Sequence, residues 1–271
     1  LTPEKFKEYI PEGWSGAAIP ILTEVQPLGV MLVAVPRDLV DTRVEVMEQS
    51  GLEPIAVELE PFALMRSAVD AQRAQETQTD TIAIVEIGAT YTHISIMSNG
   101  NFVLSRSVTI AGNSFTDAIA KALGLEMAQA EAVKENEVRV VTDELSRAQL
   151  SPVGQEASRA LEPQMEELVR EIRRSFAFYD YQQVPGGRAQ RSESGVSRAI
   201  LTGGSAKMAG LAEYLKEQLN VEVLPIDLFT PGRIALPPGA EELHAQGPLL
   251  ATALGLALRE PMIAREKGGH A

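Results

Sequence analysis

Residues 81–110 read TIAIVEIGATYTHISIMSNGNFVLSRSVTI, and they hold three apolar runs separated by short breaks. The runs are Thr81 to Ile87, Tyr91 to Met97 and Phe102 to Ile110, and the first break is Gly88-Ala89. Connections this short cannot cross over to a parallel neighbour, whereas they suit hairpins. This stretch therefore predicts an antiparallel meander of three strands.

Two helical patterns follow the meander. Ser114 begins the first and Gly124 ends it, because glycine readily takes the left-handed conformation that closes helices. The second runs from Gln155 to Gln183 and is broken or entered at Pro163. Its apolar stripe predicts a buried face made of Leu168, Ile172, Phe176 and Tyr179.

The C-terminal part of the chain alternates strands and helices. Residues 199–201 predict a buried strand that leads into Gly203-Gly204, and Val221 to Leu224 predicts another. Residues 249–258 predict an apolar final helix. Together with the meander, this alternation indicates the α/β class. The helix expected directly after the glycine pair faces inward with Met208, Leu211, Leu215 and Leu219.

The first 60 residues predict a compact αββαβ unit. A helix follows Thr2, strands follow at Ala18 to Val25 and Gly29 to Val35, and a second helix runs from Asp38 to Gly51. The last element is a short strand at Pro54 to Leu59. A unit this small cannot bury both faces of its sheet alone, so we expect an apolar surface that meets the main body or a partner.

Composition excludes several classes of function. The 271 residues include 24 Lys and Arg, 37 Asp and Glu, and no Cys, which gives a net charge of −13. This charge argues against a nucleic-acid partner, and the lack of Cys excludes thiolate metal sites and disulfides. The longest apolar stretch, Gly29 to Val35, is far short of the ~20 residues that a membrane helix needs, so we expect no direct membrane insertion.

Glu86 stands near the end of a predicted strand, and a turn of small residues, Gly88-Ala89-Thr90, follows. Phosphate-transfer folds place an acid near a metal in this way and turn backbone N–H groups towards a phosphate. The same residues also fit an ordinary hairpin turn in which glycine supplies an unusual dihedral angle.

Gly203-Gly204-Ser205 connects a predicted strand to a predicted helix. Paired glycines let a flat ligand lie against the backbone, and a helix N-terminus attracts negative charge. A tight turn in an α/β sheet explains the same residues equally well.

Glu131 and Lys134 are three residues apart and share one face of a predicted helix. They could hold a ribose and a base, or they could form an ordinary surface ion pair. The three histidines, His93, His244 and His270, show no metal-ligand spacing, and no Ser–His–Asp, Walker or GxGxxG pattern is present.

Taken in order, these segments resemble the actin-like nucleotide-binding superfamily, and most closely the PilM family of type IV pilus assembly proteins. The resemblance covers nearly the whole chain. Its blocks are residues 8–11, 31–36, 50–58, 61–66, 86–92, 113–116, 130–134, 173–176, 201–205 and 253–259.

The resemblance implies an actin-like, RNase H-like fold with an inserted αββαβ subdomain. Residues 1–60 would be the inserted subdomain, which FtsA also carries, and residues 61–80 a helix and connector. Residues 81–260 would form the second actin-like half with its closing C-terminal helix, and residues 261–271 a tail. We expect the family's N-terminal strands, with their first phosphate loop, to precede this chain.

The resemblance also implies a site for ATP or ADP with Mg²⁺ in the full-length parent, and weak or no binding by this chain. Glu86 would contact Mg²⁺ through water, where the family usually has the shorter Asp, and Ala111-Gly112 replaces a Gly-Gly pair. The implied second phosphate loop is Gly88, Ala89 and Thr90; the adenosine loop is Gly203, Gly204 and Ser205; Glu131 and Lys134 would reach ribose and base.

By the same resemblance, the expected function is a cytoplasmic adaptor for pilus assembly and twitching motility. It would bind the N-terminal cytoplasmic tail of PilN, contact the platform and motor proteins, and stay peripheral to the inner membrane through these partners. One alternative is an active ATPase or kinase, although we expect at most a weak ATPase. The other is an FtsA-like division protein that forms polymers, but Arg259 to Ala271 lacks the amphipathic membrane helix typical of FtsA.

Overall fold

The computed structural model describes residues 14–17, 33–70, 80–183, 195–229, 234, 236 and 238–259. The chain divides into two compact units, Leu1–Glu58 and Leu59–Ala271, and each is described by itself. Within the described residues, no helix combines the length and the apolar character needed to cross a bilayer.

The described part of the first unit is a strand pair followed by a helix. Strand β1 (Trp14–Ala17) pairs antiparallel with β2 (Val33–Pro36), and α2 (Arg37–Gln49) follows directly. The expected helix after Thr2 and the expected strand at Ala18 to Val25 lie outside the described residues.

The strand expected at Pro54 to Leu59 was wrong. These residues are irregular, and Ile55 and Val57 are 76% and 58% exposed. A strand needs a neighbour that satisfies its backbone N–H and C=O groups, and no described strand pairs with this segment. The local pattern of apolar residues therefore predicted a strand that the described structure does not form.

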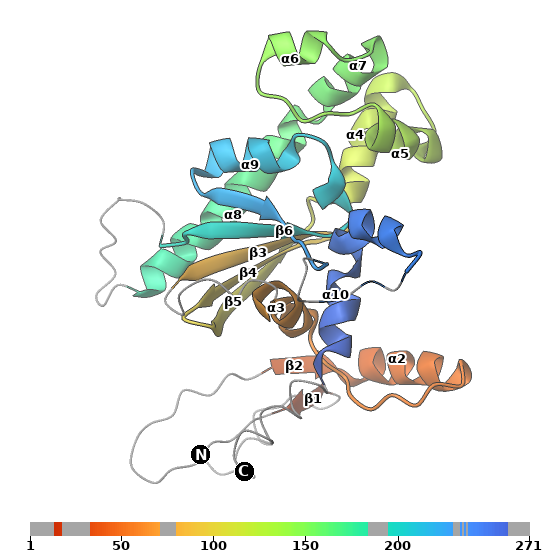
Figure 1. Cartoon of the computed structure of the whole chain (residues 1–271), viewed down its shortest axis with the longest axis vertical. Coiled ribbons are helices and arrows are strands. Elements are labelled where there is room, and N and C mark those ends of the chain that lie inside the picture. Colours follow the sequence, from red (N-terminus) through yellow and green to blue (C-terminus); the bar gives the residue numbers. More distant parts are fainter. Residues whose placement is uncertain are drawn as a thin grey trace. The chain divides into compact units, whose positions relative to one another are not determined.

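The second unit is built on a five-stranded sheet with the order β5-β4-β3-β6-β7 (Figure 1). Strands β3, β4 and β5 pair antiparallel in sequence, so the predicted meander is confirmed. Strand β6 lies parallel to β3, and β7 lies parallel to β6. The bounds are β3 (Thr81–Ile87), β4 (Thr92–Ser98), β5 (Asn101–Val108), β6 (Arg198–Thr202) and β7 (Glu222–Pro225).

Helices cover both faces of this sheet, with α8 and α9 on one side and α3 and α10 on the other (Figure 1). Alternate residues of β3 enter different cores: Val85 packs on the α8 side and Ile84 on the α3 side. The helices are α3 (Glu60–Asp70), α4 (Gly112–Leu123), α5 (Met127–Asn136), α6 (Glu144–Ala148), α7 (Pro152–Ala160), α8 (Glu162–Gln183), α9 (Leu211–Leu219) and α10 (Gly247–Ala257).

The long helical pattern is divided in two, as its break near Pro163 predicted. Helix α7 ends before Leu161, and Pro163 is the second residue of α8. This position suits proline, whose missing N–H would be unpaired in the first turn of a helix. The predicted stripe is confirmed, since all four of its residues are buried: Leu168, Ile172, Phe176 and Tyr179.

The helix expected directly after Gly203-Gly204 was wrong in part. Residues Gly204–Lys207 form one 3₁₀ turn, η1, and α9 begins only at Leu211. An isolated bridge interrupts the chain between them, because Val140 donates its N–H to the Ala209 carbonyl at 2.8 Å. The conformation of Gly210, with φ +80°, then turns the chain into α9.

Helices α3 and α10 approach each other closely. A Cβ atom at Gly255 would lie 1.9 Å from the carbonyl oxygen of Ala63, so only glycine permits this crossing. The carbonyl of Gly255 also accepts a hydrogen bond from Arg66 Nε at 2.8 Å. The helix pair therefore depends on this one glycine.

We predict that Gly255→Ala lowers the free energy of unfolding by about 2 kcal/mol or more, because added atoms in a packed interface force the backbone apart. Gly247→Ala in the same helix is the control, since its Cβ would lie 3.8 Å from its nearest neighbours, the Ile226 carbonyl oxygen and the Phe229 ring. Urea denaturation followed by circular dichroism measures both. Equal effects of the two substitutions would contradict the close approach.

Candidate functional site

A cavity of about 570 Å³ opens at the carboxyl ends of β3 and β6. Because these strands are parallel neighbours, the turns that follow them meet at one edge of the sheet, the usual ligand position in α/β folds. Thr90 is exposed and does not line this cavity. Eight of the nine sequence-predicted residues do: Glu86, Gly88, Ala89, Glu131, Lys134, Gly203, Gly204 and Ser205.

Seven further lining residues escaped the sequence analysis as site residues: Gly112, Asn113, Glu135, Lys207, Met208, Pro248 and Leu249. Asn113 belongs to the block 113–116, which was named only for its resemblance to the family, and Gly112 was named only in the Ala111-Gly112 pair that replaces a Gly-Gly pair of the family. Pro248 and Leu249 lie in the first turn of α10, whose sequence is that of an ordinary apolar helix and gives no signal of a site.

The turn after β3 is held by the start of α4. The N–H groups of Gly112 and Asn113 donate to the carbonyls of Gly88 and Ala89, at 2.9 and 2.7 Å. A Cβ atom at Gly112 would lie 3.0 Å from Ser205 Oγ and 3.1 Å from the Gly88 carbonyl, so glycine lets the three segments meet. The preceding Ala111 is extended, which a side chain tolerates.

The two glycines after β6 have different roles. Gly203 has φ +89°, and a Cβ there would lie 2.4 Å from the Ile87 carbonyl oxygen, so the fold itself requires glycine. Gly204 has no such constraint, because its Cβ would approach only the end of the Leu249 side chain, at 3.3 Å. Both glycines line the cavity, but Gly204 is the one where an added side chain tests the ligand space rather than the backbone.

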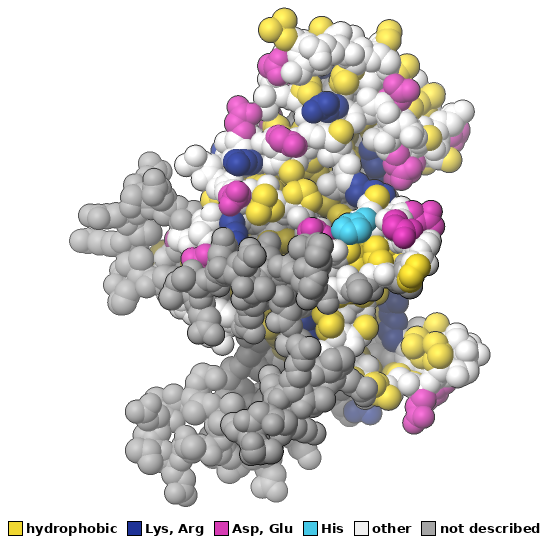
Figure 2. All heavy atoms as spheres, in the orientation of Figure 1, with side chains coloured by type: hydrophobic (Ala, Val, Ile, Leu, Met, Phe, Trp, Pro, Cys, Tyr) yellow, Lys and Arg dark blue, Asp and Glu magenta, His cyan; other side chains and the backbone are white. Residues whose placement is uncertain are grey.

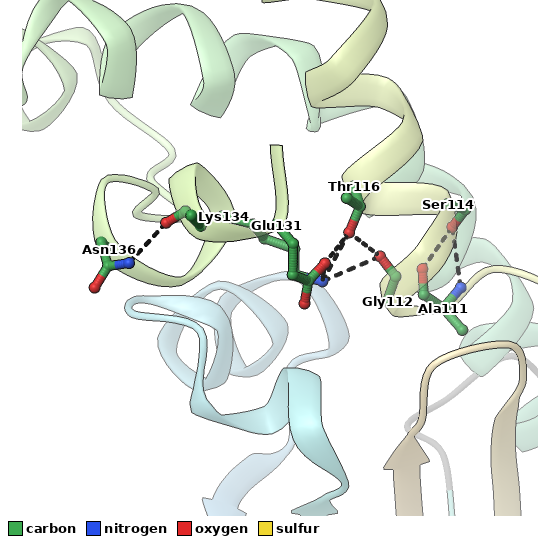
Figure 3. A network of polar contacts seen from close by, with 8 residues as sticks. Ala111, Gly112, Ser114, Thr116, Glu131, Lys134 and Asn136 are labelled. Atoms are coloured by element: carbon green, nitrogen blue, oxygen red, sulfur yellow. Dashed lines mark hydrogen bonds and ion pairs between the residues drawn. The ribbon is translucent and has the colours of Figure 1, made fainter. Parts of the chain in front are cut away.

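A polar network forms one wall of the cavity (Figure 3). Lys134 Nζ donates to Glu131 Oε2 at 2.7 Å, to Thr116 Oγ1 at 2.9 Å and to the Gly112 carbonyl at 3.3 Å. Lys134 is buried, whereas Glu131 keeps 44% of its side chain exposed. The expected helix-face pair therefore exists, and it ties α5 to the first turn of α4.

An acidic end lies beside β3. Burial and the nearby charge of Glu60 raise the pKa of Glu86 to about 7, although a hydrogen bond from Thr252 opposes the shift. Thr252 Oγ1 is 3.3 Å from Glu86 Oε1 and 3.4 Å from Glu60 Oε1. The other oxygen of Glu86, Oε2, is buried and finds no hydrogen-bond partner in the described structure.

His93 completes this acidic end. Its Nε2 is 3.8 Å from Glu60 Oε2, and its Nδ1 lies 2.8 Å from Ser107 Oγ. Ligand atoms of Glu60, Glu86 and His93 all fall within 4.8 Å of one another, so the group could hold a divalent cation. The unpaired buried oxygen of Glu86 fits such a charge.

The position of His93 beside Glu86 follows from the length of the hairpin turn. A hairpin closed by the Gly88 N–H to Tyr91 carbonyl bond sets Glu86 directly opposite His93. Register follows from the length of the turn, so this pairing could have been predicted. Glu60 gave no comparable signal, because it reaches the site only through the packing of α3 against the sheet.

Comparison with known proteins identifies the family of this chain. The family model described as type IV pilus assembly protein PilM matches residues 20–261. The chain belongs to the PilM family. The resemblance seen in the sequence is thereby confirmed.

Solved structures confirm the actin-like fold of this PilM-family chain. A PilM–PilN type IV pilus biogenesis complex matches with a TM-score of 0.73 and 28% identity, over 96% of this chain and 73% of that one. MreB5 of Spiroplasma citri bound to AMPPNP matches with a TM-score of 0.55 and 19% identity, over 87% and 67% of the two chains. EutJ of Carboxydothermus hydrogenoformans matches with a TM-score of 0.53 and 21% identity, over 83% of this chain and 61% of that one.

Among curated proteins, the cell division protein FtsA of Bacillus subtilis (strain 168) is 24% identical over 189 residues. The match takes in 65% of this PilM-family chain but only 40% of FtsA. The chain therefore spans well under half the length of this relative.

We predict that Glu86→Gln flattens the dependence of stability on pH between pH 4.5 and about 7. In this window the folded chain keeps the Glu86 proton that the unfolded chain loses, so this group's contribution to stability falls as the pH rises. The variant should exceed the wild type in stability at pH 8, where Glu86 is charged and half-buried. Denaturant titrations at a series of pH values measure the difference.

Glu60→Gln serves as a companion variant, since removing this neighbouring charge should lower the Glu86 pKa towards 4.5. Carboxyl titration by NMR reads this directly. An unchanged Glu86 pKa in Glu60→Gln would show that the two carboxyl groups are not coupled. Identical dependences of stability on pH in the wild type and Glu86→Gln would show that Glu86 does not titrate as described.

Proposed function

We propose that this chain is the nucleotide-binding part of a type IV pilus assembly adaptor that binds an extended peptide tail of PilN. The observation that carries the nucleotide proposal is the cavity itself, in which turns from both parallel strands and the Glu131 wall converge. Its volume of about 570 Å³ lies in the range of small-molecule sites.

The charges of the cavity favour a nucleotide that arrives with a divalent cation. Among the described residues, three carboxylates line it, Glu86, Glu131 and Glu135, against two lysines, Lys134 and Lys207. A bare polyphosphate would meet net repulsion there, whereas bound Mg²⁺ would supply positive charge that neutralises phosphate oxygens. Glu86, with its unpaired oxygen, and Glu60 are the residues that would hold the ion or its water.

Lys207 is the cavity cation best placed to meet a phosphate. Its Nζ donates to Gln246 Oε1 at 3.1 Å, a neutral partner, so its charge is not neutralised there. Lys134 instead gives its donors to protein oxygens. The nucleotide found in the S. citri MreB5 structure, AMPPNP, is of the class that we propose for this cavity.

We predict that the chain binds ADP or ATP weakly in the presence of Mg²⁺ and that Gly204→Val lowers this affinity at least tenfold further. The substitution places a branched side chain in the cavity beside Leu249 while the backbone stays unstrained. Isothermal titration calorimetry measures affinity, and Gly247→Ala is the folded control. If Gly204→Val stays folded and binds as the wild type does, the glycine pair is only a turn.

A weak ATPase is a second candidate, favoured by the pKa of Glu86 near 7. A carboxylate with such a pKa is suited to accept a proton from an attacking water at neutral pH. Glu86→Gln should then abolish phosphate release even at nucleotide concentrations high enough to saturate the variant. Phosphate release that survives this substitution would exclude Glu86 as the base.

The partner proposal rests on the first unit. Helix α2 has no buried residue, and its apolar residues Leu39 and Val46 are 54% and 56% exposed. Figure 2 shows hydrophobic side chains on the surface of α2. Exposed apolar side chains grouped on one helix are typical of a protein-binding surface, and the related structure is a PilM–PilN complex.

We predict that a fluorescent peptide copying the cytoplasmic tail of the cognate PilN binds the chain, and that the double variant Leu39→Glu, Val46→Glu reduces this affinity at least tenfold. The added charges remove apolar contact without disturbing a core, since neither side chain is buried. Glu45→Gln on the same helix is the control. Fluorescence anisotropy measures binding, and an unchanged affinity in the double variant would place the peptide elsewhere.

A further inference from the structure

Lys134 has no N–H left for a ligand. A lysine ammonium carries three donors, and all three point to protein oxygens: the Gly112 carbonyl, Thr116 Oγ1 and Glu131 Oε2 (Figure 3). The side chain is only 7% exposed. Although Lys134 lines the cavity, it acts on the ligand only through the groups that it holds.

Thr116 is the second residue of this arrangement. It is 2% exposed and outside the cavity lining, and its hydroxyl accepts from Lys134. Its own proton lies within hydrogen-bond reach of the Gly112 carbonyl, at 3.0 Å, and of Glu131 Oε2. Thr116 and Lys134 thus both hold the same oxygen of Glu131.

The other carboxylate oxygen of Glu131 is therefore the one presented to the cavity. Partial burial alone would raise the pKa of Glu131, but hydrogen bonds from Lys134 and Thr116 outweigh this effect and lower the pKa. The carboxylate stays ionised and accepts hydrogen bonds only. A fixed acceptor of this kind can bind a hydroxyl donor, but it has no hydrogen to donate to a phosphate oxygen.

We propose that Thr116 is a positioning residue that orients Glu131, so that the cavity discriminates between nucleosides by a sugar hydroxyl. This inference rests on the proposed nucleotide binding. It assigns a role to a buried threonine that does not touch the ligand. In this arrangement Lys134 holds Glu131, Thr116 and the Gly112 carbonyl together and does not bind the ligand itself. A carboxylate that rotates freely would accept the same hydroxyl with less preference, because ordering it would cost entropy.

A purely structural role for Thr116 makes a different prediction. A threonine hydroxyl that bonds the carbonyl four residues earlier is common in helices and has no effect on specificity. Ser114 offers a matched control, because it bonds only Ala111 in the same first turn of α4, at 2.7 and 3.0 Å. Loss of Ser114 perturbs the helix start without touching Glu131.

The test compares adenosine, 2′-deoxyadenosine and 3′-deoxyadenosine, which need no phosphate contacts, on the whole chain by ligand-observed NMR titration. The wild type should prefer adenosine over at least one deoxy form by about tenfold or more, the value of roughly one hydrogen bond to a charged group. Thr116→Val should bring this ratio close to one, and Thr116→Ser should restore it. Ser114→Ala should lower the melting temperature and leave the ratio unchanged.

Glu131→Gln provides a variant on a partly exposed side chain, should Thr116→Val fail to fold, and it should also reduce the ratio. If adenosine fails to bind the wild type, the proposed nucleotide site and this inference both fall. If adenosine binds but the ratio survives in Thr116→Val, or in Glu131→Gln where the valine variant is unfolded, the positioning role alone is overturned.

Discussion

The parallel pairing of β3 with β6 is the constraint on which the cavity depends. It sets Glu86 opposite Thr202, so the turns that follow both strands leave the sheet side by side. The contact is close enough that Gly203 must be glycine, since a Cβ would lie 2.4 Å from the Ile87 carbonyl oxygen. The position of α4, whose first N–H groups bind the Gly88 turn, follows from the same juxtaposition.

Two electrostatic environments result from this frame. On one wall, Lys134 is buried, but its hydrogen bonds offset the cost of removing its charge from water. The same bonds keep Glu131 ionised and fixed as an acceptor. At the other end, Glu86 is half-buried beside Glu60 with one oxygen unpaired, and its pKa rises to about 7. The same residue type therefore performs as a fixed anion on one side and as a titrating group on the other, because the neighbours differ.

Much of the fold could be predicted because its signals are local. The meander follows from short breaks between apolar runs, and the buried stripe of α8 follows from helical periodicity. The strand expected at Pro54 to Leu59 failed because a strand depends on a partner that the local pattern does not reveal. The break before α9 was not predicted, for a related reason. It depends on the hydrogen bond from Val140 N–H to the carbonyl of Ala209, which lies 69 residues further along the chain.

The sequence by itself determined the family, the order of the elements in the second unit and most of the residues that meet in the cavity, since each leaves a recognisable pattern of neighbours along the chain. Only the tertiary structure decided that Gly203 serves the backbone, that Lys134 has no donor to spare and that Glu60 and Thr252 flank Glu86. These properties depend on distances of a few ångströms between atoms of segments far apart in the chain. Hydrogen bonding, burial and pKa are set by those distances, and no local pattern encodes them.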